Sequence, residues 1–343
     1  MDDTDQNRIV IGNWQSAIGN ALTRIRASTY NLPEVEHDTT QLGPITVMQA
    51  THQLGNSLIR AGFVIVFVLT VVIAAQAQQR PLLTEDVDII PPGTLRIEAG
   101  IDFLQGARFP ASGLTGDLTR VGVIGVNIGF APNVEVQIEG VAQNFLSINS
   151  RGVSAIPLSI APGINSTNDT GDFTLSTKIK LRNETKRGPS LGFRFGVQLP
   201  NSNQARGIGL NQTNAYGSVL VGKKFGTDGR FNTFGNLGIA ILTAPTQLFT
   251  QNDVFTYGLA GIFRLNRQFS LAGEVNGRAN TRPGNGPLGT ESQAEARLGM
   301  QIRASGLRFD LAGIKGLTSF SPNSGVTVGV TYDTPSVFAP VKQ

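Results

Sequence analysis

The sequence predicts an all-β protein, a transmembrane up-and-down antiparallel β-barrel of about 12 strands, preceded by a signal-peptide helix. From Thr94 onward, apolar and polar residues alternate with period two in segments of about ten residues, as in strands that present one face to lipid and the other to a lumen. Clusters of Gly, Asn, Asp and Pro separate these segments, and tight connections alternate with longer ones.

Before the barrel, residues 63–75 form a long apolar run. Arg60 precedes it and Ala75-Gln76-Ala77 follow, which is the charged, apolar and small-residue order of a secretory signal peptide. Its 13 residues are fewer than the roughly 20 that a membrane-spanning helix needs, so an inner-membrane or tail anchor is the less favoured interpretation. We predict a signal peptide over residues 48–77 that is cleaved after Ala77.

Met48 would give this signal peptide a normal length. Residues 1–47 are then expected to be an upstream extension that is not translated and has no ordered structure. The mature chain is predicted to comprise a periplasmic N-terminal segment over residues 78–93, the barrel over 94–333 and a C-terminal tail over 334–343. Whether the periplasmic segment plugs the lumen stays open at this point.

Twelve segments carry the alternating pattern, and an even number returns both ends of the barrel to the periplasmic side. The predicted strands cover residues 94–104, 117–130, 134–145, 171–181, 190–199, 214–225, 230–243, 253–265, 268–279, 290–303, 306–316 and 323–333. The tight connections include 131–133, 226–229, 266–268 and 304–305, and the longest of the others are 146–170 and 200–213. We expect the tight connections on the periplasmic side and the long loops outside the cell.

One face of each predicted strand is polar, and we assign it to the lumen. Between Gln293 and Arg303, for example, Leu298 lies on the apolar face and Arg297 on the polar one. Leu298→Arg should therefore be costly and Arg297→Leu should be tolerated. The charged residues expected to line the pore are Arg96, Glu98, Asp102, Glu135, Glu139, Asp172, Lys178, Lys180, Glu274, Arg278, Glu295, Arg297, Arg303, Arg308 and Asp310.

The sheet is expected to close because no water inside a bilayer can satisfy the N–H and C=O groups of a free strand edge. A soluble β-sandwich or β-solenoid is the alternative fold. It is less favoured, because twelve long strands with a charged face are hard to bury in a protein surrounded by water.

Charge and composition narrow the possible functions. After Ala77, 24 Lys and Arg against 18 Asp and Glu leave a net charge of +6 without a basic, aromatic-rich cluster, so nucleic acid is not an expected partner. The excess should favour anions weakly inside a pore. Cys is absent, and His37 and His52 both precede Ala77. The mature chain therefore lacks the groups for Ser-His catalysis or a soft metal site, and we expect no enzyme, cofactor or metal.

Paired carboxylates could still perform acid–base chemistry. Glu135 with Glu139, and Glu291 with Glu295, are spaced four apart and so share a strand face. A charge ladder on a pore wall is the favoured interpretation, because barrel lumens are normally polar.

The start of the mature chain resembles a known family. Arg80–Asp86, the Pro91–Thr94 entry into a strand and Glu98–Gly100 within it are similar to the outer-membrane proteins grouped with the meta-pathway of phenol degradation, often described as transporters. The likeness covers residues 80–333 and rests on pattern rather than on a diagnostic motif. It implies passage of small organic molecules, aromatic ones included, through the outer membrane.

Two hypotheses follow. The first is a channel or facilitator for small solutes that lies in the outer-membrane bilayer of a Gram-negative bacterium and is inserted by the barrel-assembly machinery, with selectivity set by the lumen charges. The second is a non-conducting barrel that serves as a structural or adhesive element through its extracellular loops. Conductance distinguishes them.

Overall fold

A computed structural model of the chain describes residues 80–247, 250–284 and 286–339. The predictions for residues 1–47 and for the signal peptide at 48–77 lie outside the described residues. No helix within the described residues is long and apolar enough to cross a membrane.

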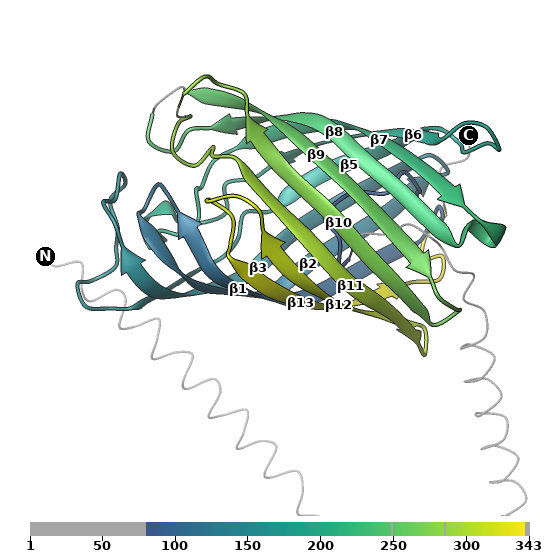
Figure 1. The fold of residues 1–343 in the computed structure, drawn as a ribbon, viewed down its shortest axis with the longest axis horizontal. Helices are drawn as coiled ribbons and strands as arrows, with labels where there is room; N and C mark the ends of the chain where they lie inside the picture. Colours follow the sequence, from purple (N-terminus) through teal and green to yellow (C-terminus); the bar gives the residue numbers. More distant parts are fainter. Residues whose placement is uncertain (1–79, 248–249, 285, 340–343) are drawn as a thin grey trace, which may run out of the picture. The chain divides into compact units, whose positions relative to one another are not determined.

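The described chain forms a single antiparallel sheet that closes on itself (Figure 1). The strands are β1 (Leu95–Phe109), β2 (Leu114–Ala131), β3 (Val134–Arg151), β4 (Ser166–Asp169), β5 (Thr174–Arg182), β6 (Ser190–Gln198), β7 (Asn214–Phe225), β8 (Phe231–Thr243), β9 (Gln251–Arg264), β10 (Phe269–Asn280), β11 (Gln293–Ala304), β12 (Leu307–Gly316) and β13 (Ser324–Asp333). Successive strands pair with one another, and β1 closes the barrel against β13. Both β4 and β5 pair with β3, at different heights, so the wall has twelve strands. The predicted fold class and strand number are confirmed.

Two ends of the barrel are distinguished below. The turn end carries the short connections β2–β3, β7–β8, β9–β10 and β11–β12. The loop end carries the connections β3–β5, β6–β7, β8–β9 and β10–β11, which are longer. β1 starts and β13 finishes at the turn end, where Leu95 and Thr334 are hydrogen-bonded to each other.

Strand bounds agree with the predicted ones within a few residues, except at the loop end of β1, β2 and β3. Residues 146–151 were predicted to be loop but continue β3, and β4 was not predicted at all. The physical reason is an apolar cluster in which Leu146 and Ile148 pack with Leu104 and Leu114. Burial of these side chains stabilises strands that continue past the alternating segments.

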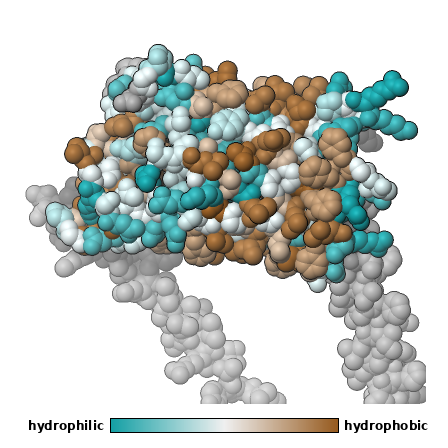
Figure 2. All heavy atoms as spheres, viewed as in Figure 1, coloured by the Kyte–Doolittle hydropathy of each residue, from teal (hydrophilic) through white to brown (hydrophobic). Residues whose placement is uncertain are grey.

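The outer wall is apolar and the inner wall is polar. Large apolar side chains that point outward stay exposed in the isolated barrel, Leu298 most of all among the exposed strand residues at 74%. Figure 2 shows apolar residues spread over the barrel wall and hydrophilic residues gathered toward its ends. A closed barrel with such a belt is the fold of outer-membrane proteins, and lipid covers the belt. The predicted outer-membrane location agrees with this fold.

A bulge at Gly122 in β2 reverses the alternation along that strand. Gly122 has a φ of +64°, a conformation that favours glycine, and the β1–β2 register shifts beside it. Asn127 is buried inside the barrel on one side of the bulge, whereas Leu118, of the opposite parity, is buried on the other. The bulge therefore turns Arg120 toward the lumen, where it pairs with Asp102.

Candidate solute pathway

The sequence predicts a periplasmic N-terminal segment over residues 78–93. The part of it that the structure describes, residues 80–93, lies inside the barrel and is called the lumenal segment. Hydrogen bonds from its backbone anchor it to the wall. The amide nitrogens of Leu83 and Thr84 each donate to the Glu274 carboxylate at 2.8 Å. Farther along, the amide nitrogen of Ile90 donates to Glu135 at 2.9 Å. Charged acceptors make these hydrogen bonds stronger than neutral ones. The segment is thus held by side chains of the barrel wall.

Apolar contacts complete the anchoring. Leu82 is buried in a cluster with Phe234, Ala260, Ile262 and Ala272 of the inner wall. At Gly258 of β9, a Cβ would lie 3.2 Å from the Thr84 Cβ, so glycine there gives the segment room to approach the wall. This apolar contact therefore helps to fix where the segment docks.

A buried ion-pair group holds the middle of the lumenal segment. Lys178 of β5 lies 2.7 Å from the Glu85 carboxylate and 3.3 Å from that of Glu135 on β3. Gln137 donates to both carboxylates, at 3.0 and 2.7 Å. The Lys178 side chain is only 1% exposed. Removing one partner would leave an uncompensated buried charge, so these residues act as a unit.

Asp86 and Asp88 continue this contact toward β5, β7 and β8. Asp88 pairs with Lys180 at 2.8 Å and with Lys224. Burial opposes its ionisation, but hydrogen bonds from the two lysines lower the pKa of Asp88 below its usual value. Asp86 accepts a hydrogen bond from Asn232 at 2.8 Å. Burial, followed by repulsion from Asp88, raises the pKa of Asp86 from 3.8 to about 6.

Docking of the lumenal segment should therefore weaken as pH rises from about 4 to about 6. The pKa of Asp86 is raised in the docked form, so its protonated carboxyl stabilises docking. This stabilisation is complete below pH 3.8 and is lost as the pH rises through about 6. The largest expected effect is on the order of 3 kcal/mol. Three charged groups face this carboxyl and keep their charges over that range: Lys178, Lys224 and Asp88. The lowered pKa of Asp88 affects docking only at lower pH.

Hydrogen exchange of the segment's amides, corrected for the intrinsic effect of pH, measures this docking. Asp86→Asn keeps the acceptor for Asn232 and should remove the dependence between about pH 4 and about pH 6, the range over which the raised pKa of Asp86 acts. The control, Asp88→Asn, should lower protection at both pH values because it removes a carboxylate paired with two lysines. Equal pH dependence in wild type and Asp86→Asn would contradict the assignment.

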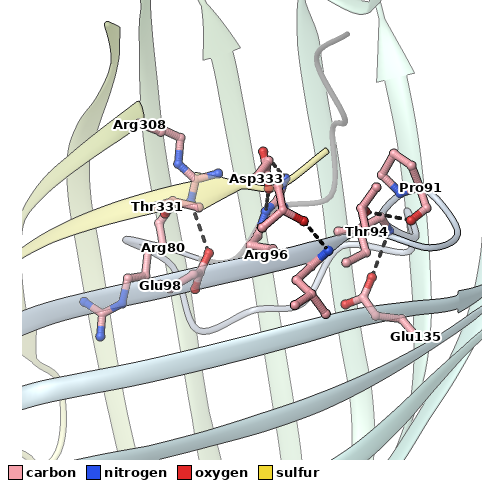
Figure 3. Close-up of polar contacts among 12 residues, drawn as sticks. Arg80, Pro91, Thr94, Arg96, Glu98, Glu135, Arg308, Thr331 and Asp333 are labelled. Carbon is pink, nitrogen blue, oxygen red and sulfur yellow. Dashed lines mark hydrogen bonds and ion pairs between the residues drawn. The ribbon is translucent and has the colours of Figure 1, made fainter. Parts of the chain in front are cut away.

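The start of the segment is held by arginines and a glutamine of β11 and β12. The Arg80 carbonyl oxygen accepts from Gln301 at 2.7 Å and from Arg308 at 3.2 Å, and that of Pro81 accepts from Arg297 at 3.0 Å. Figure 3 shows Arg308 pointing toward Glu98 and Thr331 beside Arg80. The Arg80 side chain also donates to the Val123 carbonyl oxygen of β2 at 3.0 Å, so the segment ties together strands from both ends of the barrel sequence.

The charged residues predicted to line a pore fall into three groups. Those that touch the lumenal segment are Glu135, Lys178, Lys180, Glu274, Arg297 and Arg308. Those paired with another wall residue are Arg96 with Asp333, Glu98 with Arg308, Asp102 with Arg120, Glu139 with Arg194, Glu295 with Arg297, and Asp310 with Arg308. The remaining three are Asp172, Arg278 and Arg303.

Those three have different surroundings. Asp172 lies just before β5 and accepts from the amides of Asn201 and Ser202 in the β6–β7 loop. Arg278 donates to the carbonyl oxygens of Glu291 and Gly289. Arg303 has no side-chain hydrogen bond or ion pair within the described part of the chain. A role for all fifteen residues as the lining of a conducting pore stays a prediction.

The environment of Arg297 changes the expectation that Arg297→Leu is tolerated. Arg297 faces the lumen, as its parity predicts, but it is 5% exposed, pairs with Glu295 at 2.7 Å and lies 3.7 Å from Glu274. It also donates to the Pro81 carbonyl. An apolar residue can replace a lumen-facing charge without loss of stability only where water surrounds the charge and its partners. Arg297→Leu is therefore expected to destabilise the barrel.

Several lumen residues are absent from the predicted set. Arg194 pairs with Glu139 at 2.6 Å and lies over the Tyr216 ring, 5.4 Å from its centroid. Arg194 has the same parity on β6 as Gly192 and Gly196, which face inward, so alternation along this strand could have predicted that it faces the lumen. Arg120 could not be found by parity because of the bulge at Gly122, and Glu85 lies outside the alternating strands.

Cavities lie on both sides of the lumenal segment. At the turn end, a cavity of about 1140 Å³ is lined by the β7–β8, β9–β10 and β11–β12 turns. Toward the loop end lie two cavities of about 390 and 350 Å³, both lined by Leu83 of the segment and by Arg194 and Tyr216 of the wall. The segment therefore borders both loop-end cavities, and Arg308, which holds its Arg80 carbonyl oxygen, lines the turn-end cavity.

No protein-family model and no curated protein matches the sequence. Solved structures are similar in fold. The COG4313 outer membrane channel from Pseudomonas putida F1 is 15% identical with a TM-score of 0.53, over 73% of this chain and 98% of that one. The translocator domain of the autotransporter NalP from Neisseria meningitidis is 13% identical with a TM-score of 0.41, over 83% and 97%. The first likeness shows a shared barrel fold.

Proposed function

We propose that the chain is an outer-membrane channel or facilitator for small solutes, in which the lumenal segment narrows the passage. The observation that carries the proposal is the arrangement of cavities. Leu83 of the segment lines the cavities of about 390 and 350 Å³ toward the loop end, and Arg308, which holds the Arg80 carbonyl oxygen, lines the cavity of about 1140 Å³ at the turn end. No disulfide bond holds the segment across the lumen, because the chain has no Cys.

The cavities toward the loop end support solutes of small size. Volumes of about 350 to 390 Å³ lie at the lower end of the range for small-molecule sites. The cavity of about 350 Å³ is lined by apolar side chains such as Leu83 and Leu242 together with Arg194 and Arg278. That mixture suits small organic molecules with an apolar body and a polar group. Aromatic solutes, which the sequence resemblance implies, belong to this class and are part of the proposal.

The alternative is a non-conducting barrel that acts through its loops. The dense pairing of the lumenal segment with Glu274, Lys178 and Arg297 favours it, because a permanently filled lumen passes no solute. The two functions therefore differ in whether the segment leaves enough space for ions and small molecules.

Conductance of the mature protein in planar bilayers tests the proposal. We expect discrete current steps, and we expect phenol or another small aromatic to reduce them when it occupies the loop-end cavities. The barrel's fold is confirmed in the same preparation by its strand signal in circular dichroism. A folded, inserted protein without current would support the non-conducting barrel instead.

A further inference from the structure

The cavity at the turn end has a positively charged lining that the ion pairs of the barrel do not neutralise. Arg230, Arg264, Arg267 and Arg303 line it. Among the described residues none of the four forms an ion pair, and the hydrogen bond given by Arg264, 2.6 Å to the Asp228 carbonyl oxygen, does not neutralise its charge. Charged lumen residues elsewhere are mostly paired, so this cluster differs from the rest of the wall.

Two carboxylates also line the cavity, and they do not balance it. Asp333 is held by Arg96 through hydrogen bonds of 2.6 and 2.9 Å. Arg308, a fifth arginine of the lining, is matched by Asp310 and Glu98. Asp228 is then the one carboxylate of the described lining that can offset the four unpaired guanidinium groups. The cavity keeps a net positive charge.

The strands fix two of these arginines inside the lumen. Arg264 ends β9 and Arg303 lies near the end of β11, both half-buried and of inward parity. Arg303 interacts electrostatically with three like charges, those of Arg264, Arg308 and Arg96, and with one opposite charge, that of Asp333, which Arg96 already holds. Arg230 and Arg267, in contrast, lie exposed at the turns. Strand geometry holds these like charges close together, and an anion bound between them reduces their electrostatic repulsion.

We propose that this cavity is a binding site for small oxyanions, carboxylates or phosphates, with Arg264 and Arg303 as its inner ligands. Guanidinium groups donate paired hydrogen bonds that match the two oxygens of a carboxylate or phosphate. The proposal deepens the channel function and rests on it for its biological meaning: the site concentrates anionic solutes at the turn end. Binding itself does not require that the barrel conducts.

The same oxyanion chemistry could come from a free solute or from a phospholipid headgroup. A headgroup reaches the exposed turns, hence Arg230 and Arg267, from the membrane surface. A free anion enters the cavity and reaches Arg264 and Arg303. The two sources therefore depend on different arginine pairs, and we commit to the free solute.

Isothermal titration of the folded protein in a non-ionic detergent with benzoate, and separately with inorganic phosphate, tests the site. Ionic strength is kept low, because at about 0.15 M salt the screening length is only about 8 Å. Wild type should bind benzoate and not benzamide, which has the same ring without the charge. Arg264→Gln/Arg303→Gln should weaken benzoate affinity at least tenfold.

Lys186→Gln/Arg187→Gln is the matched control. It removes the same charge from the exposed β5–β6 turn, outside the cavity lining, and should leave binding unchanged. Equal loss in this control, equal binding of benzamide, or full binding by Arg264→Gln/Arg303→Gln would overturn the proposal. Binding of the protein to vesicles of anionic lipid is measured as well. If Arg230→Gln/Arg267→Gln weakens this vesicle binding and Arg264→Gln/Arg303→Gln does not weaken benzoate binding, the cluster is assigned to lipid and the proposal is overturned.

Failure of this site and failure of the channel remain distinguishable. If wild type binds benzoate but carries no current, the anion site stands and the channel does not. If it carries current but binds no oxyanion, the channel stands and the site does not. Where both hold, reversal potentials across a KCl gradient should shift toward cations in Arg264→Gln/Arg303→Gln.

Discussion

Replacement of residues 81–88 by a glycine–serine stretch of equal length is expected to raise single-channel conductance several-fold. The replacement removes Leu82 from its apolar cluster and Glu85 from Lys178, so the segment loses most of what holds it in the lumen. Water and salt would then fill the space, and the charged wall groups that remain would be solvated. Current steps of the variant and of wild type, recorded in the same bilayer, give the comparison.

A reversible lock provides the control for this experiment. The Thr84 Cβ lies 3.2 Å from the position of a Cβ at Gly258, close to the roughly 3.5 to 4.5 Å found across disulfides. The chain has no Cys of its own, so Thr84→Cys/Gly258→Cys carries a single possible bond. When oxidised, this variant should conduct no more than wild type, and Thr84→Cys alone should not respond to reductant.

Two outcomes would contradict the role of the segment as the constriction. The first is an unchanged conductance in the glycine–serine variant whose barrel is folded. The second is an oxidised lock that conducts as well as the glycine–serine variant. Either would place the narrowest point elsewhere in the lumen.

The barrel could be predicted from sequence because its signal is local. On a strand, parity alone decides which side a residue faces, so alternation over ten residues indicates both strand and face. Leu298 and Arg297 are assigned correctly to the outer and inner faces in this way. Where the backbone breaks the alternation, as the bulge at Gly122 does, parity fails and Arg120 is missed.

The lumenal segment could not be placed from sequence, because its contacts are remote. Glu85 and Lys178 are 93 positions apart, and Arg308 reaches a carbonyl 228 positions earlier. No periodicity within the segment records such partners. The anion site was missed in part for the same reason: Arg297 and Arg303 share parity, and only the folded neighbourhood shows that one is paired and the other is not.

Leu298→Arg and Arg297→Leu, two adjacent substitutions of opposite kind, are both expected to destabilise the barrel, for different reasons. Leu298 is 74% exposed on the outer wall, so an arginine there meets lipid and should cost roughly 2 to 4 kcal/mol near mid-membrane. Arg297→Leu leaves Glu274 and Glu295 without their cation and should cost roughly 3 kcal/mol. Folding titrations from urea into lipid vesicles measure both.

The medium separates the two causes. In detergent micelles, which deform around a charge, the cost of Leu298→Arg should shrink while that of Arg297→Leu persists, because the latter arises inside the lumen. Arg297→Leu should also lower hydrogen-exchange protection of residues 80–93, since it removes the donor to Pro81, and Leu298→Arg should not. Arg297→Lys, which keeps the charge between the carboxylates, should recover most of the stability. An Arg297→Leu protein as stable as wild type would show that these carboxylates are solvated and that the lumen around the segment is wet.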